Sequence, residues 1–352
     1  MGSRIGYFAK RTVMLVATLV IATYITILIA NAGGLIDEII ISQLRYDITS
    51  NLARMPGWGQ LPEAEKTAMI EERLESAIRA KGLDRPFIER TFLYLRDALT
   101  LSLGRALFLT SASGSKQVSV IILERLPQTV LLFTTGTILY SILGLFIGLQ
   151  MARRPGGVFD KVASFFAVVT QVIPPWFFGI LFLLSFAFYI RIFPFGGMVS
   201  VPAPRDPFQK FLDILYHMAL PLFTWIFSLV GSWAYVTRNL VVQIAEDDYV
   251  IAAKAKGLPE SLIMRRYILR PALPPIITSV ALAVISSWQG AIITETVFNW
   301  PGLGSLFYAA IATLDAPIII GLTVVYAYLL VATVLILEIL YGVMDPRIRT
   351  GG

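Results

Sequence analysis

The chain of 352 residues has no cysteine and a single histidine, His217. The missing thiols exclude disulfides, zinc–thiolate sites and iron–sulfur clusters, and one histidine argues against a histidine-based metal cluster. Charged residues are also few, at 15% of the chain, whereas a soluble protein has about 25%. Hydrophobic residues make up 56% of the chain and the mean hydropathy is +0.73. These values are typical of a protein that crosses a membrane several times.

Catalytic motifs are missing as well. There is no Gly-x-x-x-x-Gly-Lys-Ser/Thr phosphate loop, no His-Glu-x-x-His motif and no Ser/His/Asp set near a membrane face. We therefore expect a non-catalytic chain that holds no metal or cofactor of its own and has no nucleic-acid partner. Charges are nearly absent from the long apolar runs, with Glu338 near the end of the last run as the exception. A proton-coupled secondary transporter usually keeps buried acids or bases as relays, so this pattern disfavours one.

Six uncharged stretches are long enough to cross a bilayer, which takes about 20 residues. None of them alternates as a barrel strand does, and lipid offers the backbone no hydrogen-bond partner outside a helix or a closed barrel. We therefore predict an all-α, polytopic membrane protein with six transmembrane helices, together with the lipid bilayer as its surroundings. The six stretches are 12–36, 126–152, 162–190, 214–237, 271–294 and 316–337.

Basic residues gather on one side of these stretches. With a cytoplasmic N-terminus, the cytoplasmic pieces hold twice as many Lys and Arg as Asp and Glu, while the outer pieces are neutral or slightly acidic. The positive-inside rule favours this orientation, which makes both termini cytoplasmic. A rival interpretation makes the first stretch a signal peptide, because basic residues precede it and Ala30-Asn31-Ala32 is typical of a cleavage site. The uncharged run is long for that purpose, since a signal core has about 7–15 residues.

The largest segment outside the predicted spans is 37–117. Its stretch 62–81 predicts a helix, with acids early, bases late and apolar residues near helical spacing, and a second helix follows Pro86. The run Ser-Ala-Ser-Gly-Ser at 111–115 predicts a flexible linker. We expect an extracytoplasmic helical region that packs on the membrane face, with direct substrate contact as the alternative. The predicted division is 1–36 for the N-terminal segment and first span, 37–117 for the outer region and 118–352 for a five-helix core.

A charged stretch, 246–275, separates two of the apolar runs. It predicts two short helices joined at Gly257-Leu258-Pro259, because acids at its start suit a helix dipole, Gly257 can end a helix in a left-handed cap and Pro259 can open the next one. The first helix carries three alanines, whose small side chains let another protein approach the backbone closely. We predict a compact helical knob on the cytoplasmic side that fits a socket, with a solvated amphipathic loop as the alternative. The alanines are Ala252, Ala253 and Ala255.

Two prolines, Pro174 and Pro175, interrupt the third apolar stretch. They break the hydrogen-bond ladder of a helix, which is tolerated in a membrane where neighbours or a water-filled path satisfy the backbone. The break is either a kink for packing or a hinge that lines a translocation path. We include Gln171 before the prolines and Gln289 at the end of the fifth stretch as candidates for that path or its gate. His217 we expect to be an interfacial hydrogen bonder.

The 246–275 stretch resembles the EAA loop of ABC-importer permeases, because Ala252-Ala253 is followed, after three residues, by Gly257. The residues Asp248-Tyr249-Val250 and Ala253-Lys254-Ala255-Lys256-Gly257-Leu258 are similar to the dipeptide/oligopeptide branch of that family. Two positions depart from the pattern. Ile251 stands where the motif has Glu, and Leu269-Arg270 stands where Leu-Pro is expected.

Other segments resemble the same branch. Glu124-Arg125-Leu126-Pro127-Gln128-Thr129 is similar to the family's start of the second span, and Met344-Asp345-Pro346-Arg347 is similar to its Asp-Pro-Arg close. The run from Glu295 to Gly304 matches the branch's Glu-x-Val-Phe-x-x-Pro-Gly-Leu-Gly hallmark. Pro301-Gly302 permits a tight turn there, so we expect an extracytoplasmic turn at an outer pore rim, where Glu295 is either hydrated or contacts substrate or a docking protein. The turn residues are Glu295, Phe298, Pro301, Gly302 and Gly304.

The resemblance implies one permease subunit of an ATP-driven importer for oligopeptides or similar solutes in the cell (inner) membrane. A second, homologous permease would complete the pore, an extracytoplasmic solute-binding protein would deliver solute, and two ATP-binding subunits, which carry the ATP and Mg, would grip the 246–270 loop as a coupling helix. The alternatives are an oligosaccharide, nickel or glutathione permease of the same family, a secondary transporter, or a membrane scaffold or sensor. The docking residues implied are Asp248, Tyr249, Ala252, Ala253, Ala255, Lys256, Gly257 and Leu258.

Overall fold

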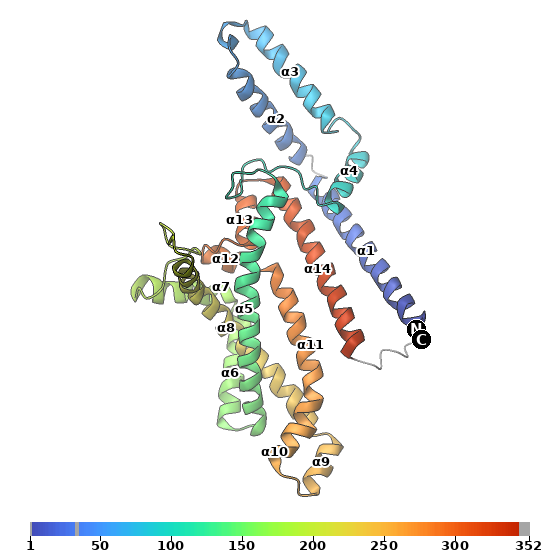
Figure 1. The fold of residues 1–352 in the computed structure, drawn as a ribbon, viewed down its shortest axis with the longest axis vertical. Coiled ribbons are helices and arrows are strands. Elements are labelled where there is room, and N and C mark those ends of the chain that lie inside the picture. Colours follow the sequence, from blue (N-terminus) through green and yellow to red (C-terminus); the bar gives the residue numbers. More distant parts are fainter. Residues whose placement is uncertain (1, 32–34, 345–352) are drawn as a thin grey trace. The chain divides into compact units, whose positions relative to one another are not determined.

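The computed structural model describes residues 2–31 and 35–344, and throughout this part the chain is almost entirely helical (Figure 1). The only strand-like pairing in the described ranges is an isolated bridge between Arg105 and Gln117. The predicted all-α class is therefore confirmed. The family-like close at 345–349 and the side chain of Glu338 lie outside the described residues. The chain packs as two compact units, residues 1–124 with 309–331 and residues 125–308 with 332–352.

Five helices are long and apolar enough to cross a membrane, judged by length and composition in the described part of the chain. A sixth span follows if the bent pair Val158–Val172 and Pro175–Tyr189 counts as one crossing. The two halves of this pair meet at 97°, so the predicted break at Pro174-Pro175 is confirmed. The five continuous spans are Thr12–Ile29, Val118–Arg153, Pro207–Ala245, Glu260–Gln289 and Ala316–Ile336.

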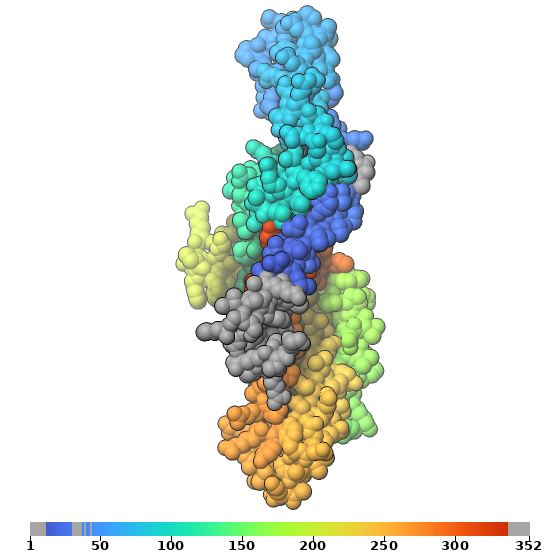
Figure 2. All heavy atoms as spheres, turned by 90° about the vertical axis from the view of Figure 1, so that its right-hand side faces the viewer, coloured from blue at the N-terminus to red at the C-terminus, as the bar shows by residue number. Residues whose placement is uncertain are grey.

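The first unit contains α1 (Gly2–Asn31), α2 (Leu35–Ala53), η1 (Trp58–Gln60), α3 (Glu63–Ala80), α4 (Phe87–Leu99) and the first part of α14 (Ala316–Met344). Helix α2 packs along α3, and α4 packs on α1. In Figure 2, α4 and the segment after it (cyan) lie against α1 (blue). Ile27, Ala98 and Val324 form a buried core that joins three of these helices.

Both helices predicted in the outer region are present as α3 and α4, and Gly82 with φ of 66° follows α3. Helix α2 was not predicted. The expected flexible linker at 111–115 is wrong, because this run forms an ordered turn. The Ser111 N–H donates to the Ser115 carbonyl at 2.9 Å, and the Ala112 N–H donates to the Glu124 carboxylate at 2.8 Å.

The second unit begins with most of α5 (Val118–Arg153) and continues through the broken span, α6 (Val158–Val172), α7 (Pro175–Phe182) and the π-helix η2 (Leu183–Tyr189). The long α8 (Pro207–Ala245) follows. Glycines let these helices approach closely: a Cβ on Gly148 would lie 2.5 Å from the Ala234 carbonyl oxygen, and one on Gly231 would lie 2.8 Å from the Cα of Ala167. Phenylalanine rings of α7 and α8 also meet edge to face, since Phe178 and Phe182 both contact Phe227 in this geometry.

The rest of the second unit forms the cytoplasm-facing loop of our prediction and a turn at the opposite end of a span. The loop contains α9 (Asp248–Ala255), α10 (Glu260–Leu262) and the π-helix η3 (Ile263–Leu269), and it leads into α11 (Arg270–Ser286) and η4 (Ser287–Gln289). The turn contains α12 (Ile292–Val297) and leads into α13 (Leu303–Ala312). The fifth span was expected to end at Gln289 and Gly290, and it does end at Gln289, where Gly290 adopts φ of 67° and interrupts the helix.

Candidate functional site

Helix α9 is short and ends at a glycine. Its backbone runs from Asp248 to Ala255, and Gly257 then takes φ of 74°, a left-handed conformation that glycine adopts without strain. The Gly257 N–H donates to the Lys254 carbonyl at 2.9 Å. Pro259 lies just before α10 with extended backbone. The predicted helix end at Gly257 and helix start at Pro259 are both confirmed.

The second of the two predicted short helices is not short. From Glu260 the chain runs through α10, η3 and α11 as one helical span to Gln289. The π-helix at Ile263–Leu269, with its wider i→i+5 hydrogen bonding, continues this helix without ending it. The loop therefore contains one separate short helix, α9, which four residues, 256–259, join to the helical span that begins at Glu260.

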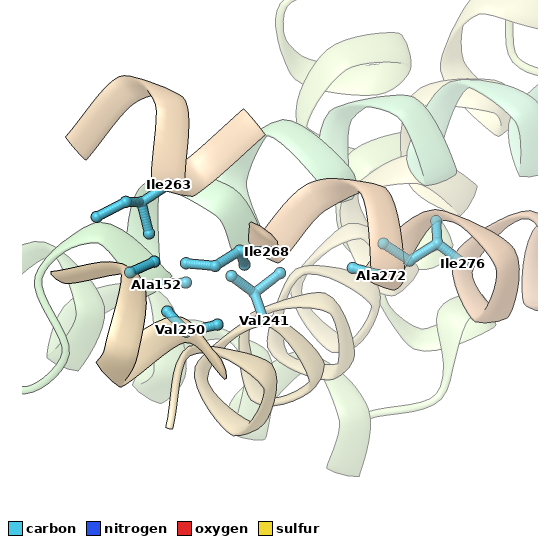
Figure 3. Packing of buried hydrophobic residues seen from close by; sticks show 8 residues of the cluster. Ala152, Val241, Val250, Ile263, Ile268, Ala272 and Ile276 are labelled. Atoms are coloured by element: carbon cyan, nitrogen blue, oxygen red, sulfur yellow. The ribbon is translucent and has the colours of Figure 1, made fainter. Parts of the chain in front are cut away.

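Buried side chains fix α9 to the helices around it (Figure 3). Val250 and Ala253 of α9 lie in one cluster with Val241 of α8. The exposed fraction is 0% for Val250, 3% for Ala253 and 1% for Val241. The same cluster contains Ala152 from the end of α5, Ile263 and Ile268 from η3, and Ala272 and Ile276 from α11. A cluster that draws on four helices holds α9 as part of a packed body.

Most of the residues implied for docking lie on the surface of this loop. Tyr249 has 43% of its surface exposed, and Ile251, which replaces the Glu of the motif, has 53% exposed. Two implied residues lie elsewhere: Leu258 is half-buried and packs on the cluster, and Ala253 is inside it. The small side chain of Ala253 therefore lets α9 approach its own chain, which corrects our expectation that it offers a surface. The exposed residues are Asp248, Tyr249, Ala252, Ala255, Lys256 and Gly257.

An ion pair connects the base of α8 to the start of α6. The Arg238 guanidinium donates to both oxygens of Asp160, at 3.0 Å from Nε and 2.8 Å from Nη2. The Gly156 N–H also donates to Asp160, at 2.8 Å. The Asp160 side chain is 5% exposed and that of Arg238 is 22% exposed. The pair holds the α5–α6 turn against the helix that leads into α9, and no sequence motif marked it.

The turn between α11 and α13 is organised around Glu295, which is completely buried. The Thr129 hydroxyl of α5 donates to Glu295 Oε1 at 2.9 Å, and the Ser305 N–H donates to Oε2 at 2.9 Å. Our expectation of a hydrated or substrate-contacting carboxylate at a rim is therefore wrong. Its surroundings are tight because Gly290 and Gly302 both face it: a Cβ on Gly290 would lie 2.6 Å from Oε1.

The aromatic and apolar residues of this turn are buried together with the carboxyl. Phe298 is 2% exposed, Trp300 is fully buried, and the Trp300 indole N–H donates to the Gln128 carbonyl at 2.9 Å. The Leu303 N–H donates to the Thr129 hydroxyl at 2.7 Å. Gly304 lies against the backbone of Ile292, 2.6 Å from its Cα if a Cβ is added. The predicted turn is therefore closed, and hydrogen bonds to Gln128 and Thr129 hold it against the N-terminal part of α5.

Burial raises the pKa of Glu295 from 4.5 to about 7, because desolvation disfavours the charged form. The N–H of Ser305 and the hydroxyl of Thr129 oppose this rise through their hydrogen bonds, and Arg125 opposes it through its charge. The carboxyl is thus poised to change charge near neutral pH. Sequence reasoning singled out Glu295 but missed Thr129 as its partner, because 166 residues separate them.

The four candidates for a path or gate lie at helix breaks. Gln171 is exposed one residue before the end of α6, and Pro174 and Pro175 form the start of α7. Gln289 is half-buried at the end of η4. No hydrogen bond between the described residues joins these side chains, so their role stays a prediction. His217 is 6% exposed and its Nδ1 lies 2.9 Å from the Asp213 carbonyl, as expected of a structural hydrogen bonder.

The chain is similar to known transport proteins. A family model described as "Binding-protein-dependent transport system inner membrane component" matches residues 142–350. The chain is 30% identical over 293 residues to the oligopeptide transport system permease protein AppB of Bacillus subtilis (strain 168). The matched region covers 82% of this chain and 90% of that protein. It is 29% identical over 281 residues to the dipeptide transport system permease protein DppB of Lactococcus lactis subsp. cremoris (strain MG1363), with 80% and 87% covered.

A third relative is the dipeptide transport system permease protein DppB of Escherichia coli (strain K12), 26% identical over 312 residues, with 84% of this chain and 91% of that protein covered. The family model spans more than half of the chain, and its residues include α6 to α14 with the α9 loop and the buried turn. The predicted membership is thereby confirmed. The chain belongs to the family of binding-protein-dependent transport system inner membrane components and is the transmembrane permease subunit of an ABC transporter.

Proposed function

We propose that this subunit forms half of the translocation path of an ATP-driven importer for peptides or similar small solutes, and that α9 is where an ATP-binding subunit docks. The relatives named as oligopeptide and dipeptide permeases support the solute class. The resemblance supports a second homologous permease, two ATP-binding subunits that hold ATP and Mg, and an extracytoplasmic solute-binding protein. The excess of basic residues supports cytoplasmic termini.

The observation that carries the docking proposal is the contrast between the two faces of α9. One face, with Val250 and Ala253, is locked into a cluster that includes residues of α5, α8 and α11. The other face leaves the side chains of Tyr249 and Ile251 exposed, next to the small exposed side chains of Ala252 and Ala255. Exposed aromatic and apolar side chains among small ones are typical of a protein interface.

A rigid connection between this surface and the spans supplies the mechanism. Because the cluster joins α9 to three membrane helices, a displacement of the docked ATPase moves the bases of those helices together. Repacking of a body held in this way is a rigid-body transition rather than a local deformation. ATP binding and hydrolysis on the partner subunits would then alternate the access of the path from one side of the membrane to the other.

Tryptophan on the exposed face tests the docking surface. Ala252→Trp fills space that a partner would occupy, so we expect at least a tenfold loss of solute-stimulated ATP hydrolysis in the assembled transporter, with normal membrane insertion. The matched control is Ala64→Trp, an equally exposed alanine on α3, which should leave hydrolysis unchanged. Undiminished hydrolysis by Ala252→Trp would contradict docking at α9. Stimulation by short peptides but not by oligosaccharides in the wild-type transporter tests the solute class.

A further inference from the structure

A pocket of about 670 Å³ lies in the first unit, and all of its lining residues belong to that unit. Its volume is in the range of small-molecule sites. The lining is divided into a basic rim and an apolar floor. The rim residues are Arg79, Lys81, Arg85, Arg96 and Arg105, with Asp97 as the one acid, and the floor includes Leu93, Leu103, Leu107, Pro317 and Ile320.

Three cations of the rim are free to bind a ligand. Arg79 pairs with Glu75 at 2.8 Å, and Arg96 pairs with Asp97 at 3.0 Å. Within the described residues, Lys81, Arg85 and Arg105 form no ion pair. The backbone of two of them is fixed locally, since the Arg85 N–H donates to the Gly82 carbonyl at 3.3 Å and Arg105 forms the isolated bridge to Gln117.

The floor of the pocket includes residues near the ends of two candidate membrane spans. Pro317 and Ile320 lie in the first turns of α14, whose membrane window begins at Ala316. Ile27, which also lines the pocket, is near the end of the α1 window at Ile29. The cations come from the segment outside the spans, between α3 and α5. The apolar floor thus adjoins the ends of two candidate spans, and the cations lie in the segment outside those spans.

We propose that this pocket binds one anionic glycerophospholipid, with its phosphate on Lys81, Arg85 and Arg105 and the start of an acyl chain on the floor. Guanidinium groups bind phosphate oxygens through paired, charge-assisted hydrogen bonds. Basic pockets beside transmembrane helices hold anionic headgroups for the same reason. The nearby Asp315 carboxylate does not oppose the anion strongly, because it accepts the N–H groups of Leu107, Phe108 and Leu109, at 3.1, 2.8 and 2.9 Å.

Lipid binding to the full-length chain in nanodiscs tests the proposal, with dioleoyl phosphatidylglycerol as the probe in a phosphatidylcholine background. We expect retention of phosphatidylglycerol on native mass spectrometry, and about thirtyfold weaker binding by the double variant Arg85→Gln/Arg105→Gln, as the loss of two lipid-facing cations predicts. The control is Arg54→Gln/Arg73→Gln, which removes two exposed arginines of the same outer region that do not line the pocket. Equal binding by both double variants would overturn the proposal.

Two further arms distinguish the occupant. A phosphatidylglycerol analogue with a photoreactive acyl chain should label Leu103 and Ile320 of the floor above the general labelling of Ile21 and Ile25, which are exposed on α1. Glycerol phosphate should compete only weakly, because it lacks the acyl chain that fills the floor. Full competition would show that the pocket binds a soluble anion and not a lipid. The variant Arg85→Gln/Arg105→Gln could instead bind phosphatidylglycerol normally but no longer bind the transporter's solute-binding protein. That result would show that the basic rim contacts a protein, and the lipid proposal would fail.

Discussion

The hydroxyl of Thr129 donates a 2.9 Å hydrogen bond to Glu295, a carboxyl without exposed surface. The same hydroxyl accepts the Leu303 N–H at 2.7 Å. One side chain of α5 thus satisfies both the short helix α12 and the start of α13. The closed turn between two spans is held by this contact as well as by the proline and glycine that allow the chain to reverse.

Removal of the Thr129 hydroxyl should destabilise the second unit. Thr129→Val keeps the shape of the side chain but leaves the Glu295 carboxyl and the Leu303 N–H each short of a buried partner, which costs about 1–3 kcal/mol. The measurement is thermal unfolding of the purified protein in detergent. The control is Thr224→Val, because Thr224 is equally buried but its hydroxyl donates only within its own helix, to the Leu220 carbonyl at 2.9 Å. Equal losses in the two variants would argue against a special role for Thr129.

The stability of the protein should fall as pH rises towards neutrality. Glu295 has a pKa of 4.5 when solvated and about 7 in the fold, so between these values the folded state binds more protons than the unfolded state. Stability therefore decreases with rising pH in this window, and the loss is complete above about pH 7. Its upper bound is about 3 kcal/mol at about 1.4 kcal/mol per pKa unit.

Glu295→Gln isolates this contribution because it keeps the shape of the side chain and removes the titration. Unfolding midpoints measured between pH 5 and pH 8 should show a decline in the wild type that is smaller in the variant. An identical pH dependence in both proteins would refute a raised pKa at this carboxyl.

The Asp160–Arg238 pair should show strong coupling in a double-mutant cycle. Arg238→Gln leaves a nearly buried carboxylate without its cation, which costs about 3 kcal/mol or more, whereas Asp160→Asn/Arg238→Gln replaces both charges and should recover part of that loss. The measurement is again unfolding in detergent. Additive effects of the single variants would mean that the 2.8 Å contact contributes nothing specific.

The left-handed backbone of Gly257 predicts a selective response to substitution. No atom lies within 4 Å of a Cβ added there, so the cost of a side chain comes from φ of 74° and not from a clash. Gly257→Val should strain the end of α9 by about 1–2 kcal/mol, while Asn tolerates this conformation. We expect Gly257→Asn to keep most solute-stimulated ATP hydrolysis of the assembled transporter and Gly257→Val to lose it. Equal losses would show that the partner needs the bare glycine surface.

Features that depend on neighbouring residues were predictable from the sequence. Apolar runs revealed the spans, Pro174-Pro175 revealed the break of 97°, and Gly257 revealed the end of α9. These predictions succeeded because the energetic cause lies within a few residues: lipid excludes charge, proline lacks an N–H, and glycine accepts positive φ.

Features that depend on distant residues were not predictable. The burial of Glu295 requires Thr129, and the anchoring of the α5–α6 turn requires Arg238 to meet Asp160, 78 positions away. The alternation of buried and exposed residues in α9 was also missed, since Ala252 and Ala253 look alike in the sequence and differ only in what lies beside them. Such contacts are decided by tertiary packing, which a single sequence does not encode locally.

The unbroken run from Glu260 to Gln289 gives the molecule mechanical leverage. A rod of 30 residues is about 45 Å long, so tilting it by about 10° at the ATPase end carries its far end sideways by about 8 Å. If an ATP-binding subunit docks at α9 as proposed, a modest displacement there is enough to shift the other end of this helix by several ångströms.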